Sequence, residues 1–148
     1  MTRFIEFICD GIVAKAELLE DKAPQTCNFV WGILPVNAYI THAIYSGAEV
    51  AIILPGYFPV EAENATTAVL PWEIFFASLQ AKDYFDVEND FSELAFFYDR
   101  NTGPRMLDGL VKVNIFAKFI TGQDEFKRLC LQIRRGEGKK AVTIRQAQ

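Results

Sequence analysis

The sequence predicts a mainly β protein, a closed eight-stranded barrel whose ends are covered by two α-helices. Short runs of apolar or alternating residues, separated by turn residues, recur about eight times along the chain. Apolar residues follow helical spacing in only two segments, one early and one late. The 148 residues contain no composition break or internal repeat, so we expect a single domain over residues 1–148.

The chain opens with a predicted hairpin. Phe4 to Cys9 is a short apolar run, and Asp10-Gly11 is a hairpin turn signal. Ile12 to Leu19 then alternates between two faces, as a strand does. Strand, turn and strand are therefore expected at the N-terminal end.

A helix is expected next. Asp21 is the candidate N-cap, and Pro24 falls in the first turn, where proline is tolerated. Cys27 and Val30 begin an apolar stripe at helical spacing, and Pro35 ends the helix.

The middle of the chain predicts strands separated by loops. Residues 37–54 form two strands around a Ser46-Gly47 turn, and 55–70 form a proline-rich loop. Residues 73–78 form another strand, and the acidic segment 82–92 is a connection. Residues 94–98 are a further strand that ends at a turn over 99–104.

The last third returns to alternation and then changes period. Val111, Val113, Ile115, Ala117 and Phe119 are predicted to share one face of a strand. Residues 123–134 carry an i, i+3, i+4, i+7 apolar stripe, which predicts the second helix. Glycines at 136 and 138 stop it, and 141–145 is the last strand.

Composition excludes several classes of protein. The apolar fraction of 51% excludes intrinsic disorder, and no uncharged run approaches the roughly 18 residues of a membrane span. The net charge of −4 argues against nucleic-acid binding, although residues 125–148 alone carry +5. The N-terminus has no apolar signal region, so we expect a cytoplasmic protein. The three cysteines have neither disulfide nor zinc spacing, so we expect buried thiols and no metal or other cofactor.

Five stretches in the same order resemble cyclophilins, and the resemblance runs nearly end to end. These are residues 23–29, the Met106-Leu107-Asp108-Gly109 turn, the strand 113–122, the helix start 124–126 and the closing strand 139–144. A bacterial family of cyclophilin-like proteins of unknown function is more similar still. Segments resembling Tyr45–Val50 and Glu73–Phe76 recur in that family.

The departures from cyclophilins bear on activity. The prolyl isomerases of this fold place an arginine after the histidine of a Phe-His-Arg stretch, and it donates hydrogen bonds to the substrate. The matching stretch here is Thr41-His42-Ala43, and alanine has no donor. Met106 replaces the tryptophan of the Trp-Leu-Asp-Gly turn, and no glutamine stands in the Ser92–Phe97 stretch. We therefore expect no efficient prolyl isomerase and assign no catalytic residue.

The candidate site residues each have a second interpretation. His42, the only histidine, is a general base or a structural core residue. Glu61 and Glu63 point the same way on an extended segment, which suits acid–base work or a cation, or they belong to a solvated loop. Aromatic residues beside loops line a groove or close the barrel ends. The predicted ligand-binding residues are His42, Tyr45, Glu49, Glu63, Asn64, Trp72, Phe97 and Met106.

Three functions remain open from the sequence. The leading one is a binding module that holds a small molecule or peptide in a groove on the side of the barrel. The second is an enzyme, either a weak prolyl isomerase or a small-molecule enzyme that uses Glu63, Glu49 or His42. The third is a structural protein in which an apolar rim forms a homo-oligomer.

Overall fold

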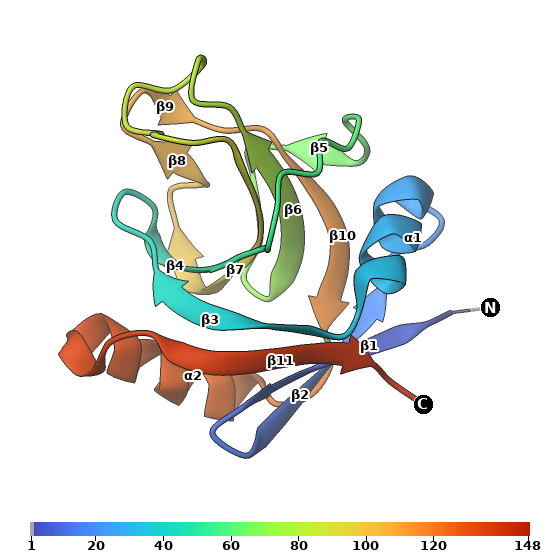
Figure 1. Ribbon diagram of the computed structural model, residues 1–148. Helices are drawn as coiled ribbons and strands as arrows, with labels where there is room; N and C mark the ends of the chain where they lie inside the picture. Colours follow the sequence, from blue (N-terminus) through green and yellow to red (C-terminus); the bar gives the residue numbers. More distant parts are fainter. Residues whose placement is uncertain (1) are drawn as a thin grey trace.

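A computed structural model describes residues 2–148 and shows a closed antiparallel barrel (Figure 1). Around the barrel the strands follow the order β2 (Ile12–Leu18), β1 (Phe4–Cys9), β11 (Lys140–Gln146), β3 (Val36–His42), β4 (Gly47–Ile53), β7 (Phe91–Asn101), β6 (Glu73–Leu79) and β10 (Val113–Phe119). The barrel closes where β10 pairs with β2, with Ala117 opposite Leu18. The predicted closed eight-stranded barrel is confirmed.

Two α-helices complete the barrel core. α1 (Pro24–Ile33) packs beside β10, and α2 (Gln123–Gln132) packs against β7 and β2 (Figure 1). A π-helical turn, η1 (Ile133–Glu137), follows α2. Buried residues of both helices, such as Cys27 and Phe126, belong to the same apolar cluster as the barrel interior.

Three short strands lie outside the barrel. β5 (Ala65–Thr66) pairs with the start of β10, inside the segment that the sequence predicts as a loop. β8 (Arg105–Met106) and β9 (Gly109–Leu110) form a separate hairpin between β7 and β10. This hairpin is important because it covers one face of the barrel wall.

The barrel interior is filled by interlocking aromatic rings. Phe96 and Phe119 lie with ring centroids 4.9 Å apart, and Phe7 and Phe126 contact them edge-on or tilted. Trp72 stacks on Phe96 at 6.0 Å. Each such ring removes a large apolar area from water, so the interior is the main source of stability.

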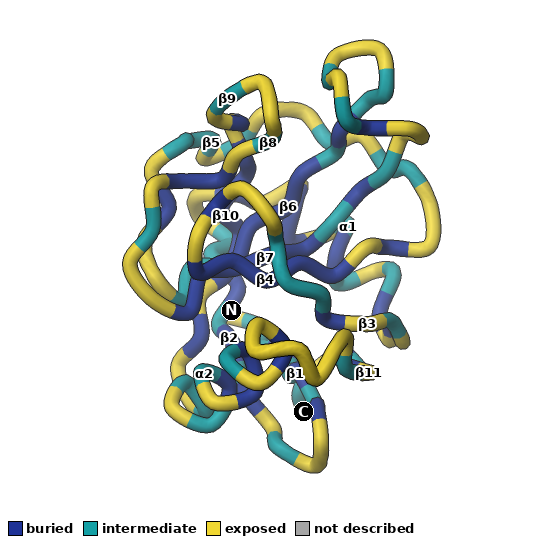
Figure 2. The backbone as a smooth tube through the Cα atoms, turned by 90° about the vertical axis from the view of Figure 1, so that its left-hand side faces the viewer, coloured by how far each residue is buried: buried dark blue, intermediate teal, exposed yellow. Residues whose placement is uncertain are grey.

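A second apolar cluster lies on the outer face of the same wall. Successive strand residues point to opposite faces, so Val50 and Ile52 enter the barrel while Ala51 faces outward. Phe75, Ala95 and Phe97 join this outer cluster and are buried. Figure 2 shows β4 and β7 as buried segments through the middle of the molecule, which means that loops cover them on the outside.

β7 is longer than the sequence predicts. It begins at Phe91 rather than at Leu94 and continues to Asn101, through the predicted start of the turn. The polar residues that suggested a connection are held in the strand because β6 pairs with one edge of β7 and β4 with the other. As a result Glu93 is a strand residue on the outer face.

The alternate residues of β10 do not all lie on one face of the sheet. Its pairing with β6 shifts between Ile115 and Ala117, which marks a β-bulge. Val113 and Ile115 therefore belong to the outer cluster, whereas Ala117 and Phe119 belong to the interior. The prediction of a single face over 111–119 was wrong because alternation cannot reveal an inserted residue.

The prediction of Asp21 as the N-cap of α1 was also wrong. Residues 19–23 form a turn in which the Lys22 and Ala23 amides donate to the Leu19 carbonyl, and the N-cap is Ala23. The side chain of Ala23 makes no capping hydrogen bond to the first turn of α1. The acceptor for the first amides of α1 comes instead from Glu63, in a distant segment.

The basic end of the chain lies against the acidic barrel. Lys140 pairs with Asp10 at 3.0 Å, Arg145 with Glu6 at 3.0 Å and Lys127 with Asp99 at 3.1 Å. These exposed ion pairs contribute little stability individually, but they place part of the basic charge next to opposite charge.

The three cysteines are free and buried, as expected. Burial raises the pKa of the Cys9 thiol to about 11 and those of Cys27 and Cys130 to about 12. All three therefore stay protonated near neutral pH and are poor nucleophiles. Within residues 2–148, no helix has the length and apolar character needed to cross a membrane.

Candidate functional site

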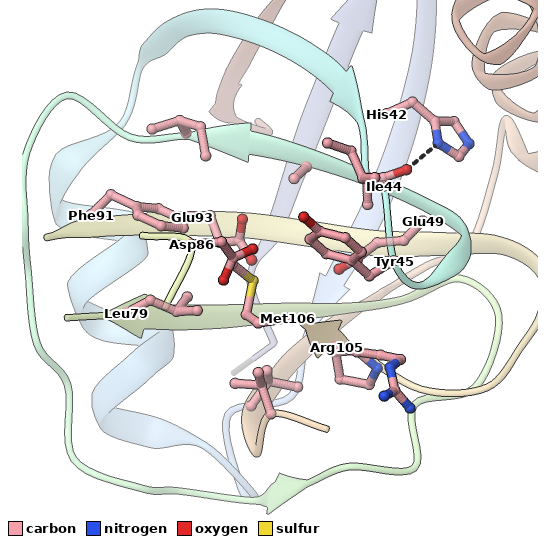
Figure 3. A pocket seen from close by; sticks show the side chains of 16 residues that line it. His42, Ile44, Tyr45, Glu49, Leu79, Asp86, Phe91, Glu93, Arg105 and Met106 are labelled. Atoms are coloured by element: carbon pink, nitrogen blue, oxygen red, sulfur yellow. Dashed lines mark hydrogen bonds between the residues drawn. The ribbon is translucent and has the colours of Figure 1, made fainter. Parts of the chain in front are cut away.

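A pocket of about 340 Å³ opens on the outer face of the barrel wall (Figure 3). Its floor is formed by β4 and β7, and its sides by the β3–β4 turn, the β6–β7 loop and the β8–β9 hairpin. The volume lies at the lower end of the range for small-molecule sites, about 300–1,000 Å³. The hollow therefore has the size of a small organic ligand.

The strand register explains why the wall is hollow at this point. Ala51 of β4 pairs with Ala95 of β7, so two methyl side chains meet where larger residues would fill the space. Glu49 lies two residues before Ala51 on β4, and Glu93 lies two residues before Ala95 on β7. Because side chains two apart share a face, both glutamates face outward on either side of this small floor.

Glu49 is a buried carboxyl residue at one end of the pocket floor. Its relative exposure is 5%, and its backbone carbonyl accepts a 2.9 Å hydrogen bond from the Ala43 amide across the strand pair. Burial raises the pKa of the Glu49 carboxyl to about 7, although the Ser46 hydroxyl acts in the opposite direction. The residue thus exchanges its proton close to neutral pH.

Two further carboxyl groups are directed into the same pocket. Burial, together with the charge of Glu49, raises the pKa of Glu93 to about 8. Asp86 enters from the β6–β7 loop, and its Oδ1 is buried without any hydrogen-bond partner among residues 2–148. Figure 3 shows Glu93 and Asp86 directed into the pocket near Met106, with Glu49 beside Tyr45.

The carboxyl groups have no cationic partner in the described part of the chain. None of the ion pairs between residues 2 and 148 includes Glu49, Glu93 or Asp86. Arg105 lines the pocket, but it is exposed and its guanidinium points away from the carboxyls in Figure 3. Among the described residues, no three His, Cys, Asp or Glu side chains lie close enough together to bind a metal ion.

His42 stands at the edge of the pocket with both ring nitrogens engaged. Nδ1 lies 2.8 Å from the Ala43 carbonyl oxygen, and Nε2 lies 2.7 Å from the Tyr98 hydroxyl. A carbonyl can only accept, so Nδ1 carries the proton and the Tyr98 hydroxyl donates to Nε2 in the neutral ring. The geometry therefore favours the structural interpretation of His42 over the general base.

The structure brings four of the eight predicted residues to this pocket, namely His42, Tyr45, Glu49 and Met106. Tyr45 lies at the rim and is 37% exposed, and Met106 lines the side formed by β8. Phe97 lies beneath the pocket, fully buried against Phe75 in the outer cluster. Trp72 lies elsewhere, stacked on Phe96.

Glu63 is brought to the start of α1 and Asn64 to β10, rather than to the pocket. Glu63 Oε1 accepts from the Thr26 amide and hydroxyl, both at 2.8 Å, and Oε2 accepts from the Gln25 amide at 3.1 Å. Burial by itself raises the Glu63 pKa, but these three hydrogen bonds outweigh it and lower the value. Asn64 donates from Nδ2 to the Ile115 carbonyl. Glu63 is therefore the N-terminal cap of α1, supplied from 37 residues away.

Three of the pocket residues that the sequence did not predict, Glu93, Asp86 and Ala51, determine its charge and its size. Glu93 was hidden by the prediction that β7 starts at Leu94, and Asp86 lies in a loop with no periodic signal. Ala51 offers only a small side chain, which has meaning once its partner Ala95 is known. One signal for Glu93 was available in Glu93-Leu94-Ala95. If the strand is extended backward, Glu93 falls two positions before Ala95 and therefore on the same face.

The barrel and the outer pocket together define a cyclophilin-like protein with an acidic pocket on its wall. Within that class the chain belongs to a family described as "Protein of unknown function (DUF3830)", whose model matches residues 7–145. The expected bacterial origin stays a prediction. No curated protein matches the chain.

Solved structures show the same fold in proteins of low sequence identity. McbB, solved in complex with tryptophan, superposes with a TM-score of 0.69 at 19% identity over 95% of this chain. The hypothetical protein AF2241 from Archaeoglobus fulgidus gives 0.61 at 14% identity, covering 98% of this chain and 95% of that protein. The Mimivirus cyclophilin gives 0.53 at 9%, covering 98% and 86%.

These likenesses establish the fold. The chain spans 44% of the length of McbB, so McbB contains more than half of its residues outside the shared barrel. At such identities function does not follow from the fold.

Proposed function

We propose that this protein binds a small organic molecule in the outer pocket. The observation that carries the proposal is Glu49, which is 5% exposed in an apolar hollow and has no cationic partner in residues 2–148. A buried carboxyl of this kind destabilises a fold unless something compensates for its lost hydration. A ligand that completes its interactions accounts for its presence.

The walls supply the apolar contacts that a small ligand needs. Leu79, Phe91 and Val113 surround the floor, and Tyr45 and Met106 stand at the rim. Mostly apolar walls with a few convergent polar groups are the usual composition of a small-molecule site. McbB provides an example of a small molecule, tryptophan, bound by a protein with this fold.

The residues opposite Glu49 support binding rather than prolyl isomerisation. Ala43 faces Glu49 directly across the β3–β4 pair, at the position where the resembling isomerases carry a donor arginine. Isomerisation of a prolyl bond has a barrier of about 18–20 kcal/mol, and loss of a placed donor commonly costs about a hundredfold or more in rate. An acidic pocket also repels the carbonyl oxygen that such an arginine would bind.

The binding test uses three aromatic probes of similar shape: 2-phenylethylammonium, 2-phenylethanol and 3-phenylpropanoate. Each is titrated into ¹⁵N-labelled protein while the amide spectrum is followed. We expect at least one probe to shift the amides of Glu49, Ala51 and Glu93 saturably. Ala51→Leu fills the floor and should abolish the shifts, while Ala65→Leu, outside this pocket, should not. If none of the probes binds, the proposal is wrong.

A prolyl isomerisation assay on a short Xaa-Pro peptide separates binding from the isomerase alternative. We expect activity at least about a hundredfold below that of an authentic cyclophilin measured alongside. Activity comparable to the cyclophilin would overturn this interpretation of Ala43.

A second candidate function, acid–base catalysis, is favoured by one observation. The pKa values of about 7 for Glu49 and about 8 for Glu93 suit groups that take and return protons near neutral pH. In such a reaction the Glu49 carboxylate would take a proton from the carbon next to a substrate carbonyl. The same proton, or one exchanged with solvent, would then return to that carbon. Deuterium uptake from D₂O at the α-carbon of phenylacetaldehyde, above the buffer rate and lost in Glu49→Gln, would establish it. Uptake equal in both proteins would exclude it for this probe.

A further inference from the structure

The three unpaired carboxyls of the pocket specify the charge of its ligand. We propose that the pocket takes an organic cation, an ammonium group carried on a compact apolar or aromatic body. This inference rests on the proposed binding function and goes further by naming the ligand class. Glu49, Glu93 and Asp86 all line one cavity of about 340 Å³, and none of them forms an ion pair within residues 2–148.

The charged and polar groups that face Glu49 come from several elements. β7 presents Glu93, the β6–β7 loop presents Asp86, and β3 with its turn presents His42 and Tyr45. β8 presents Arg105, which is exposed and directed away from the carboxyls (Figure 3). The parts of β6 and β10 that line the cavity carry only Leu79, Val111 and Val113.

Asp86 supplies an independent sign of a missing donor. Its Oδ1 is buried and accepts no hydrogen bond from residues 2–148. Buried polar atoms in native proteins nearly always have a partner, so the orphan oxygen leaves the Asp86 carboxyl, which lines the cavity, short of donors. An ammonium group is a suitable partner because it offers up to three donors and a positive charge.

The remaining walls select what carries the ammonium. Leu79, Phe91 and Val113 give an apolar lining, and the small floor over Ala51 leaves room for a ring or short alkyl chain. Tyr45 at the rim and Phe91 inside add aromatic faces, which attract organic cations. A bare metal ion gains nothing from such walls, so an organic cation fits them better.

Binding of the cation should be linked to proton release. At neutral pH Glu49 and Glu93 are partly or mostly protonated. A positive charge beside them favours the ionised form, so the carboxyls lose protons to the solvent as the ammonium enters. Affinity for an ammonium compound should therefore rise with pH until both groups are ionised.

The test compares the same three probes by calorimetry at about pH 8.5 and about pH 5.5. At the higher pH, 2-phenylethylammonium should bind at least about tenfold more tightly than 2-phenylethanol, and 3-phenylpropanoate should bind most weakly. At the lower pH the preference for the ammonium should shrink to less than about threefold. Near pH 7, heats measured in two buffers of different ionisation enthalpy should show release of about half to one proton per ammonium bound.

Substitutions test whether the pocket carboxyls cause the preference for the ammonium probe. Glu49→Gln and Glu93→Gln keep the shape of the pocket and should each lower the ammonium affinity about tenfold at the higher pH while leaving the 2-phenylethanol affinity unchanged. Glu88→Gln, an exposed acid of the β6–β7 loop, is the matched control and should change neither.

The two proposals fail in different ways. If 2-phenylethanol binds in the pocket as tightly as the ammonium, or 3-phenylpropanoate binds best, the cation inference is wrong while small-molecule binding stands. If no probe binds at either pH, both are wrong. Ammonium binding that is unchanged in both glutamine variants would show attraction to general acidity rather than to this site, and would also overturn the inference.

Discussion

Glu49 is buried and Glu63 is partly buried, and both lie beside the barrel wall. Their carboxyl groups differ in the hydrogen-bond donors around them. Glu63 accepts three hydrogen bonds from the first turn of α1, and these lower its pKa. Glu49 faces Ala43, an alanine without a donor, and burial raises its pKa to about 7. One region of the molecule gives its carboxylate three donors, whereas in the other only the Ser46 hydroxyl acts against the effect of burial.

The difference separates structural from functional acids. A carboxylate that receives amide and hydroxyl donors from its own chain contributes to folding and needs no ligand. A carboxyl that lies in a cavity with too few donors to offset its burial reduces stability when it ionises, and it can interact with a ligand. Burial alone would group the two residues together, whereas the count of donors distinguishes them.

The largest expected effect is a gain of stability in Glu49→Gln at high pH. In the folded protein Glu49 holds its proton up to about pH 7, whereas in the unfolded chain it titrates near 4.5. Unfolding therefore releases a proton between these pH values, and wild-type stability falls as the pH rises through that window. The raised pKa corresponds to about 3 kcal/mol lost above the window.

The glutamine variant should escape this loss. Urea unfolding should show Glu49→Gln more stable than the wild type by about 3 kcal/mol at about pH 8.5 and nearly equal to it at about pH 4, below the window. Glu88→Gln, fully outside the pocket, should follow the wild type at both pH values. A destabilised Glu49→Gln at the higher pH would mean that the donors to the carboxylate outweigh the cost of burying it.

The same substitution at the other glutamate should act in the opposite direction. Glu63→Gln replaces a charged acceptor at a helix N-terminus by a neutral one and should cost about 1 kcal/mol at neutral pH. Because the pKa of Glu63 is lowered, this contribution is present at neutral pH and is lost as the pH falls through the folded pKa. Urea unfolding measures it, with Glu61→Gln as the exposed control. Equal stability of Glu63→Gln and Glu61→Gln would refute the capping role.

A smaller effect is expected when the pocket acid is given a partner. Ala43→Arg places a guanidinium directly across the strand pair from Glu49. It should lower the Glu49 pKa and add up to about 1 kcal/mol at about pH 8.5, since opposite charges across strands contribute about 0.2–1 kcal/mol. Ala43→Leu, which has size without charge, is the control. If both variants show the same stability profile with pH, the arginine does not reach Glu49.

Much of the fold could be predicted from the sequence because its signals are local. Alternation and the Asp10-Gly11 turn identified β1 and β2, and the stripe from Phe126 to Ile133 identified α2. The order of these elements was sufficient to predict a closed barrel.

The candidate site was only partly predictable because it depends on contacts between distant segments. The start of β7 at Phe91 is fixed by its pairing with β6 and β4, and it carries Glu93 onto the pocket face. The cap of α1 by Glu63 spans 37 residues, so local sequence suggested Asp21 instead. Glu63 and Glu49 looked alike in sequence, and their donors could be assigned only in the folded protein.

The most direct test of the contrast is a ¹³C NMR titration of the glutamate side-chain carboxyls in the wild-type protein. We expect Glu49 to titrate near pH 7, Glu93 near pH 8 and Glu63 below the ordinary value of 4.5. The glutamine variants assign the three signals. If Glu49 and Glu93 titrate with the ordinary pKa of a glutamate, the pocket carboxyls are solvated or already paired. That result would contradict the claim that they are buried without enough partners.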